Sequence, residues 1–169
     1  MRACGVGGVC PDLAPLIGPP VRQILGAALG IADGVQLDRL ERAFRAAYDS
    51  DGWRLTRCMP GVRPMLEQLR RAGVSLSVVT NKPAHATGLI LRELALDGCF
   101  REVVCRDGGC ADGKAGMLTD LLDRQAIPRA ECMMVGDTLE DWHAARAAGI
   151  ECALVGQGTS NKETLVIQS

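Results

Sequence analysis

The fold of this 169-residue chain is decided by one stretch, Cys132-Met133-Met134-Val135-Gly136-Asp137-Thr138-Leu139-Glu140-Asp141. Its first four residues are apolar and predict a buried β-strand, and a helix is expected from about Leu139 to Ala148, with Gly149 as its terminator. Between them stands Asp137. An acidic residue between an apolar strand and a helix N-terminus lies where phosphate and metal chemistry is carried out. The stretch therefore predicts an α/β protein with a polar site after this strand.

Strands and helices alternate on both sides of this unit. The pattern predicts helices over about 62–72, 84–94 and 115–124, and strands over 74–79 (ending at Thr80), 102–105 and 150–155. Strands that alternate with helices of this length are typical of βαβ crossovers. We therefore expect an α/β fold with a Rossmann-like parallel sheet.

A two-helix unit precedes this region. Helical spacing runs from Val21 to Ile31, and a second amphipathic helix follows, with an apolar face made by Leu37, Leu40, Phe44 and Tyr48. The sequence Asp49-Ser50-Asp51-Gly52 predicts a turn that returns the chain to the strand-containing region.

Charge and hydropathy exclude two classes of partner. The chain has 19 Lys+Arg and 20 Asp+Glu, a net charge of -1, and no long basic run, so no nucleic-acid partner is expected. No apolar stretch reaches the roughly 18 uncharged residues of a membrane span, so no membrane partner is expected. No secretory signal is readable in residues 1–18, which favours a cytoplasmic location.

A reducing compartment leaves the eight cysteines free. Cys132 and Cys152 stand in apolar runs and are expected to be small buried hydrophobes. Cys105 and Cys110 flank a Gly-rich turn without a second pair or a nearby histidine, so a redox or metal role for them stays open.

Polar residues follow the first three predicted strands of the sheet. The three groups are Thr80-Asn81-Lys82, the segment 107–114 that ends at Lys114, and Gly136 to Asp141. In open parallel sheets the ligand site lies outside the carboxyl ends of the strands. A hydroxyl, a cation and carboxylates that converge there can hold a phosphate and Mg²⁺.

These residues resemble known motifs in order and spacing. The motifs are Val78-Val79-Thr80-Asn81-Lys82-Pro83, Gly113-Lys114, and Val135-Gly136-Asp137-Thr138 with Asp141 and Ala144-Ala145-Arg146-Ala147-Ala148-Gly149; Ile17-Gly18-Pro19-Pro20 and Pro60-Gly61-Val62 add to them. Over about residues 16–158 the chain resembles the haloacid-dehalogenase (HAD) superfamily, and most closely its phosphoglycolate-phosphatase-like members. The resemblance implies an irregular segment over 1–18, a partial helical cap over 19–58, a HAD-like core over 59–158 and a tail over 159–169.

The resemblance also assigns roles. It implies that Thr80 binds the transferring phosphoryl group, that Asn81 shapes the phosphate pocket and that Lys114 neutralises the phosphate. Asp137 would be the Mg²⁺ ligand and Asp141 a second carboxylate of the metal shell. The residues alone allow other readings: Thr80 as a helix N-cap, Lys114 as a solvated lysine, and Asp141 as a partner of the helix dipole.

The superfamily's D-x-D-G-T nucleophile motif is not found. Before Ile17 the one aspartate is Asp12, without a preceding strand. Asp49 to Gly52 has the D-x-D-G spacing but follows a helix, and Ile31 to Gly34 begins with a residue that cannot attack phosphorus, so both are interpreted as turns.

The resemblance places the nucleophile strand in the middle of the sheet, between the strand that ends at Thr80 and the one that ends at Gly136. Its loss would leave two inner strand edges unpaired, which is costly when they are buried. Residues 3–10, a second copy of the chain or a complementing N-terminal fragment could each fill the gap, and the sequence does not choose among them.

The expected function is that of a Mg²⁺-dependent phosphatase of small phosphorylated metabolites, impaired in this chain because the nucleophile is not found. The alternative is a non-catalytic or truncated HAD remnant that binds phosphate and Mg²⁺ or needs another polypeptide. A receiver-like regulatory domain, which shares the parallel sheet and the acidic site, ranks last.

Overall fold

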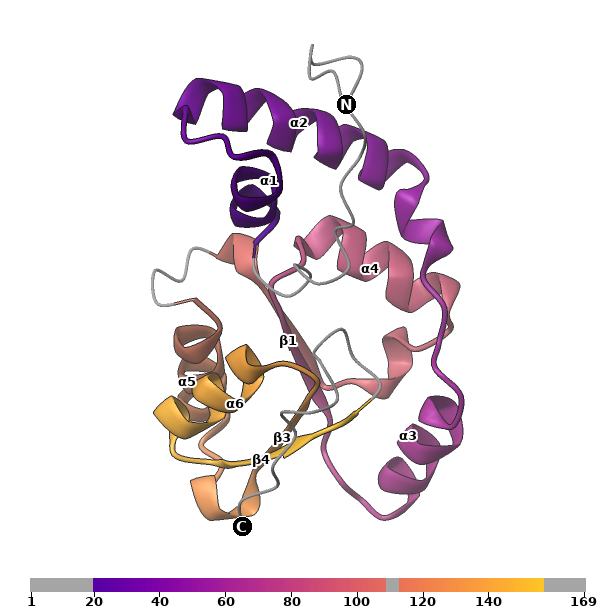
Figure 1. Ribbon diagram of the computed structural model, residues 1–169. Helices are drawn as coiled ribbons and strands as arrows, with labels where there is room; N and C mark the ends of the chain where they lie inside the picture. Colours follow the sequence, from indigo (N-terminus) through magenta and orange to yellow (C-terminus); the bar gives the residue numbers. More distant parts are fainter. Residues whose placement is uncertain (1–19, 109–112, 157–169) are drawn as a thin grey trace.

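The computed structural model describes residues 20–108 and 113–156 (Figure 1). The helices are α1 (Val21–Leu29), α2 (Gly34–Ser50), α3 (Val62–Arg71), α4 (Ala84–Glu93), α5 (Gly113–Gln125) and α6 (Leu139–Ala148). The strands are β1 (Ser77–Thr80), β2 (Glu102–Cys105), β3 (Met133–Gly136) and β4 (Glu151–Leu154), and short 3-10 turns include η3 (Gly52–Leu55) and η5 (Arg106–Gly108). Each predicted helix and strand is present, so the α/β prediction is confirmed.

The described strands form two separate parallel pairs. β1 pairs with β2, and β3 pairs with β4, while no backbone hydrogen bond within the described residues joins β1 to β3. This division falls between the strands that end at Thr80 and at Gly136, where the sequence analysis places the gap.

The layer formed by α5 and α6 packs against both pairs of strands. Figure 1 shows α5 and α6 on one side of the strands and α3 and α4 on the other. Leu118 and Leu122 of α5 form a buried cluster with Ala144 and Ala148 of α6. Val79 of β1 and Met134 of β3 pack against this cluster from the two pairs. The strand pairs therefore share a single core, which fixes their carboxyl ends relative to each other.

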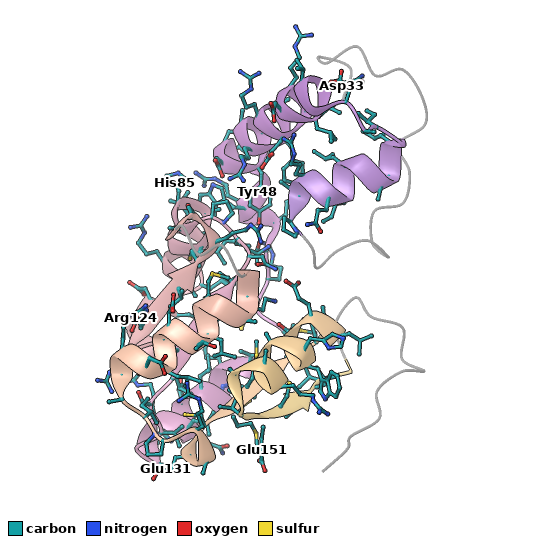
Figure 2. All side chains as sticks on the ribbon, turned by 90° about the vertical axis from the view of Figure 1, so that its left-hand side faces the viewer. Asp33, Tyr48, His85, Arg124, Glu131 and Glu151 are labelled. Atoms are coloured by element: carbon teal, nitrogen blue, oxygen red, sulfur yellow. The ribbon has the colours of Figure 1, made fainter. Side chains whose placement is uncertain are left out.

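The helices α1 and α2 form a separate layer at one end of the molecule (Figure 1). Asp33 caps α2, since its carboxylate accepts a hydrogen bond from the N–H of Val35. At the other end of α2, Tyr48 lies close to α4, the helix that carries His85 (Figure 2). Lys82 approaches the Tyr48 ring, with Nζ 5.8 Å from the ring centroid.

Two predicted boundaries are wrong. The first strand begins at Ser77 and not at Val74, because the N–H of Val74 bonds to the carbonyl of Leu69 and closes the end of α3, with Gly73 in the left-handed region at φ 76°. The turn predicted from Asp49 begins later, because α2 runs on through Ser50.

The expected burial of β3 is also wrong. Met133 and Val135 are 59% and 60% exposed. Met134 points to the α5/α6 cluster, and because side chains alternate along a strand, its two neighbours point to the opposite face. No described element covers that face of β3.

The cysteines do not follow the prediction either. Cys132 and Cys152 are only half-buried, whereas Cys105 is buried. Burial raises the pKa of the Cys105 thiol, which disfavours the reactive thiolate. Cys110 lies outside the described residues, as do Asp12 and the segments 1–18 and 159–169. In the described ranges no helix is long and apolar enough to cross a membrane.

Candidate functional site

The site is built where the chain leaves β1 and β3. Asn81 directly follows β1, and its Nδ2 donates a hydrogen bond of 2.8 Å to Oε1 of Glu140 on α6. This contact joins the carboxyl ends of the two strand pairs. The predicted convergence of the segments after β1 and β3 is therefore present in the structure.

The turn after β3 is organised around the carboxylate of Asp141. Thr138 is the N-cap of α6 and forms a capping box with Asp141. Oδ2 of Asp141 accepts hydrogen bonds from the N–H of Asp137 (3.1 Å), the N–H of Thr138 (3.0 Å) and the hydroxyl of Thr138 (2.8 Å). The Asp141 carboxylate thus fixes the backbone of the acidic turn.

Gly136 makes this turn possible. A Cβ atom at position 136 would lie 2.4 Å from Cβ of Asp141, closer than side chains approach one another. Only glycine therefore lets the end of β3 pass beside the Asp141 side chain.

Lys114 stands at the start of α5 and reaches the same carboxylate. Its Nζ lies 2.7 Å from Oδ1 of Asp141 and 3.9 Å from Oε2 of Glu140. The Lys114 side chain is 11% exposed, so it is not a solvated lysine. Burial by itself would raise the pKa of Asp141, but hydrogen bonds from Lys114 and Thr138 outweigh it and the pKa lies below its ordinary value.

Thr80 is not a helix N-cap. Pro83 holds that position in α4, and the Thr80 hydroxyl instead accepts a hydrogen bond of 3.1 Å from the N–H of Lys82. At the start of α4, the backbone N–H of Ala84 donates hydrogen bonds of 2.9 Å and 3.0 Å to the two carboxylate oxygens of Asp107 in η5. The segment after β2 therefore braces the loop that carries Thr80.

Asp137 is the half-buried carboxylate next to this network. Its backbone is fixed by Asp141, while its side chain makes no hydrogen bond or ion pair with the described residues. No group of three His, Cys, Asp or Glu side chains within residues 20–108 and 113–156 could hold a metal. Mg²⁺ is bound by one or two carboxylates and keeps several waters, so a donor set of Asp137 with Asp141 behind it fits this ion.

Two further residues take part in the site without having been predicted from the sequence. Glu140 was quoted without a role, yet it contacts both Asn81 and Lys114. The capping role of Thr138 was also missed, although the spacing Thr-x-x-Asp is that of a capping box. For Glu140 no local pattern exists, because its partners are 59 and 26 residues away in the sequence.

The two nucleophile decoys lie in the α1/α2 layer or at its end. Asp33 is the N-cap of α2, as expected of a turn residue, and Asp49 is part of α2. Neither follows a strand, so neither occupies the place of an attacking aspartate.

A parallel α/β core with a threonine, a lysine and an aspartate at the carboxyl ends of its strands defines a class of phosphoryl-handling hydrolases. The chain belongs to the haloacid dehalogenase-like hydrolase family, which matches residues 11–155. The receiver-like alternative is thereby set aside.

The curated relatives carry several different names. The chain is 36% identical over 152 residues to the tyrosine-protein kinase PtkA of Mycobacterium tuberculosis, covering 87% of this chain and 50% of that protein. It is 32% identical over 130 residues to phosphoglycolate phosphatase 1 of Pseudomonas aeruginosa, covering 75% and 47%. The chain spans about half the length of these curated relatives.

Solved structures share the fold. A haloacid dehalogenase-like hydrolase from Bacteroides fragilis superposes with a TM-score of 0.85 at 21% identity, over 95% of this chain and 77% of that one. PtkA of M. tuberculosis superposes with a TM-score of 0.80 at 28% identity, over 99% and 77%. The phosphoglycolate-phosphatase-like, HAD-type ancestry inferred from the motifs is confirmed.

Proposed function

We propose that this chain carries the phosphate-binding and Mg²⁺-binding half of a phosphatase site for small phosphorylated metabolites. The observation that supports it most strongly is the buried contact of Lys114 with Asp141, beside the open carboxylate of Asp137. A buried lysine held among carboxylates is a cation prepared for an anionic ligand.

Each residue has a chemical task in this proposal. The Thr80 hydroxyl and the Asn81 amide lie on the loop after β1, where they can donate hydrogen bonds to phosphate oxygens. Lys114 offsets negative charge on the phosphoryl group, and Asp141 and Glu140 hold its ammonium in place. Mg²⁺, bound at Asp137, would neutralise charge on the phosphate oxygens.

We propose further that turnover by this chain alone is impaired. None of the aspartates in the described ranges lies at the end of a strand between β1 and β3, where an attacking carboxylate would be needed. The alternative is a non-catalytic HAD remnant that binds phosphate and Mg²⁺. The higher identity to a protein named as a tyrosine kinase makes transfer to a tyrosine hydroxyl a second activity to assay.

The experiment combines a binding measurement with an activity measurement. We expect calorimetry to show Mg²⁺ binding that Asp137→Ala abolishes, with Asp97→Ala, an exposed site far along the chain, as the matched control. We expect no release of phosphate from an aryl phosphate or from phosphoglycolate, and no labelling of a tyrosine peptide with ATP.

The outcomes separate the proposals. Mg²⁺ binding unchanged by Asp137→Ala would refute the site. Phosphate release that Asp137→Ala abolishes would confirm the site but refute the impairment, and would direct the search for the nucleophile beyond the described residues.

A further inference from the structure

Glu140 is the side chain that joins the loop after β1 to the start of α5. Its Oε1 accepts the hydrogen bond of 2.8 Å from Nδ2 of Asn81, and its Oε2 lies 3.9 Å from Nζ of Lys114. Asn81 follows β1, Lys114 lies in the first turn of α5, and Glu140 belongs to α6. One carboxylate therefore contacts two of the residues to which the proposed function gives the phosphate.

The two oxygens of Glu140 have different surroundings. Oε1 has the Asn81 amide as its donor, whereas Oε2 is buried and makes no hydrogen bond with the described residues. The contact of Oε2 with Lys114 is an ion pair that is too long for a hydrogen bond. A buried oxygen without a donor costs free energy, and a glutamine would still accept a hydrogen bond from Asn81. The bond to Asn81 therefore explains Oε1, and the negative charge has a separate role.

The charge of Glu140 acts on Lys114 and on any ligand that binds there. Lys114 already forms an ion pair of 2.7 Å with Oδ1 of Asp141, and the open carboxylate of Asp137 stands on the same turn. Three carboxylates around one ammonium leave the ligand-free site negative. Charges this close interact strongly where burial lowers the effective dielectric constant. Such a site favours a divalent cation and disfavours a free phosphate.

We propose that Glu140 is a positioning residue whose charge also selects between ligands. It holds Asn81 and Lys114 in place, and its negative charge makes the ligand-free site bind Mg²⁺ in preference to phosphate. The Lys114 ammonium is thereby kept from anions until a cation offsets the carboxylates. This role rests on the proposed function, because it concerns the same site, and it adds an order of binding in which Mg²⁺ precedes phosphate.

Glu140→Gln separates the charge from the hydrogen bond. The variant keeps an oxygen that accepts from Asn81 and removes the charge beside Lys114. We expect calorimetry to show that inorganic phosphate binds about fivefold more tightly or better in the absence of metal. Mg²⁺ in the absence of phosphate is expected to bind about threefold more weakly or worse. Opposite changes for an anion and a cation identify an effect of charge, because damage to the structure would weaken both.

Two further variants complete the experiment. Glu151→Gln is the matched control, since Glu151 is exposed and begins β4, at the end of the strand pair opposite to the site. It should leave both affinities unchanged. Glu140→Ala removes the acceptor for Asn81 as well as the charge. In this variant, and not in Glu140→Gln, the backbone amides of Asn81 and Lys82 should exchange with solvent about threefold faster or more, with no ligand present.

The outcomes separate the role of Glu140 from the proposed function. Equal phosphate affinities of the parent chain and Glu140→Gln, or phosphate and Mg²⁺ affinities that change in the same direction, would refute the charge role and leave the phosphate site in place. If no variant binds phosphate or Mg²⁺, the proposed function fails and the charge role fails with it. The positioning of Asn81 is judged without ligand, and equal amide exchange in Glu140→Gln and Glu140→Ala would refute it.

Discussion

At the scale of single residues, the site depends on how one carboxylate is used. Both oxygens of Asp141 are engaged, Oδ1 by Lys114 and Oδ2 by the Thr138 turn. Asp141 therefore serves the site by holding a cation and a backbone in place, while Asp137 keeps an open carboxylate. Asp137 and Asp141 thus have different tasks, because the carboxylate of Asp141 is held by hydrogen bonds and that of Asp137 makes none with the described residues.

Gly136→Ala tests the close approach of β3 to Asp141. The new Cβ would lie 2.4 Å from Cβ of Asp141, so the turn must shift, and we expect unfolding to become easier by about 2–4 kcal/mol. The control is Gly88→Ala in α4, where an added Cβ would meet no atom within 4 Å beyond its own stretch of helix, and which should stabilise by about 0.5–1 kcal/mol. Urea denaturation of both variants measures the difference, and equal midpoints would contradict the argument.

The lowered pKa of Asp141 predicts a contribution to stability that depends on pH. A carboxyl whose pKa is lower in the folded state stabilises the protein above its unfolded-state pKa, ordinarily 3.8, and that stabilisation is lost as the pH falls through the lower folded value. Asp141→Asn should therefore destabilise the protein at pH 7 but much less at pH 2. Thermal unfolding across this range measures it, with the exposed Asp97→Asn as control; a constant difference would show that charge is not the cause.

At the scale of elements, the sequence predicted the existence and type of each helix and strand, because periodicity and glycine terminators are local signals. Gly149 ends α6 in the left-handed region, as predicted. Val74 was wrongly predicted to begin the first strand. Gly73 adopts a left-handed conformation, which lets the N–H of Val74 bond to α3 in spite of the β propensity of valine. The exposure of Val135 was missed because burial depends on elements that pack from elsewhere in the chain.

The Thr138 cap tests how an element supports the site. Thr138→Ala removes the hydroxyl that donates to Asp141 and accepts from its N–H, and should cost about 1 kcal/mol. Thr138→Ser keeps the hydroxyl and should recover most of that stability. Mg²⁺ affinity should fall in the alanine variant alone, because the turn that carries Asp137 loses its anchor; calorimetry on both variants tests this, and an equal loss would contradict it.

At the scale of the whole molecule, the predicted gap between the strand pairs was the least local inference and followed from the family's strand order. The contacts that hold the pairs together could not be predicted in the same way. Glu140 accepts a hydrogen bond from Asn81, which lies 59 residues away in the sequence. The ion pair of Lys114 with Asp141 likewise forms only when the chain is folded. The sequence indicated which residues reach the edge of the sheet, and packing of α5 on α6 decides which of them meet.

The junction between the α1/α2 layer and the core provides the last prediction. Trp53 is 7% exposed and belongs to η3, the turn that contacts both α2 and α4, and Lys82 approaches the Tyr48 ring across the same boundary. A buried aromatic anchor of this kind couples the stability of the parts that it joins, so we expect the two layers to unfold as one cooperative unit.

The chain has two tryptophans, one at this junction and one in the core, and each can report alone. Trp142→Phe leaves Trp53 as the junction reporter, and Trp53→Phe leaves Trp142 on α6 as the core reporter. Trp53→Phe breaks no hydrogen bond, because the indole N–H of Trp53 has no acceptor within the described residues, but the smaller ring leaves space at a buried site and lowers the overall urea midpoint, so each midpoint is compared only within its own variant. In each variant the urea midpoint from fluorescence should coincide with the midpoint from circular dichroism of the whole chain. If Trp53 fluorescence instead changes at lower urea than the circular dichroism of the same variant, the α1/α2 layer separates from the core before the core unfolds, and Trp53 is a hinge and not an anchor.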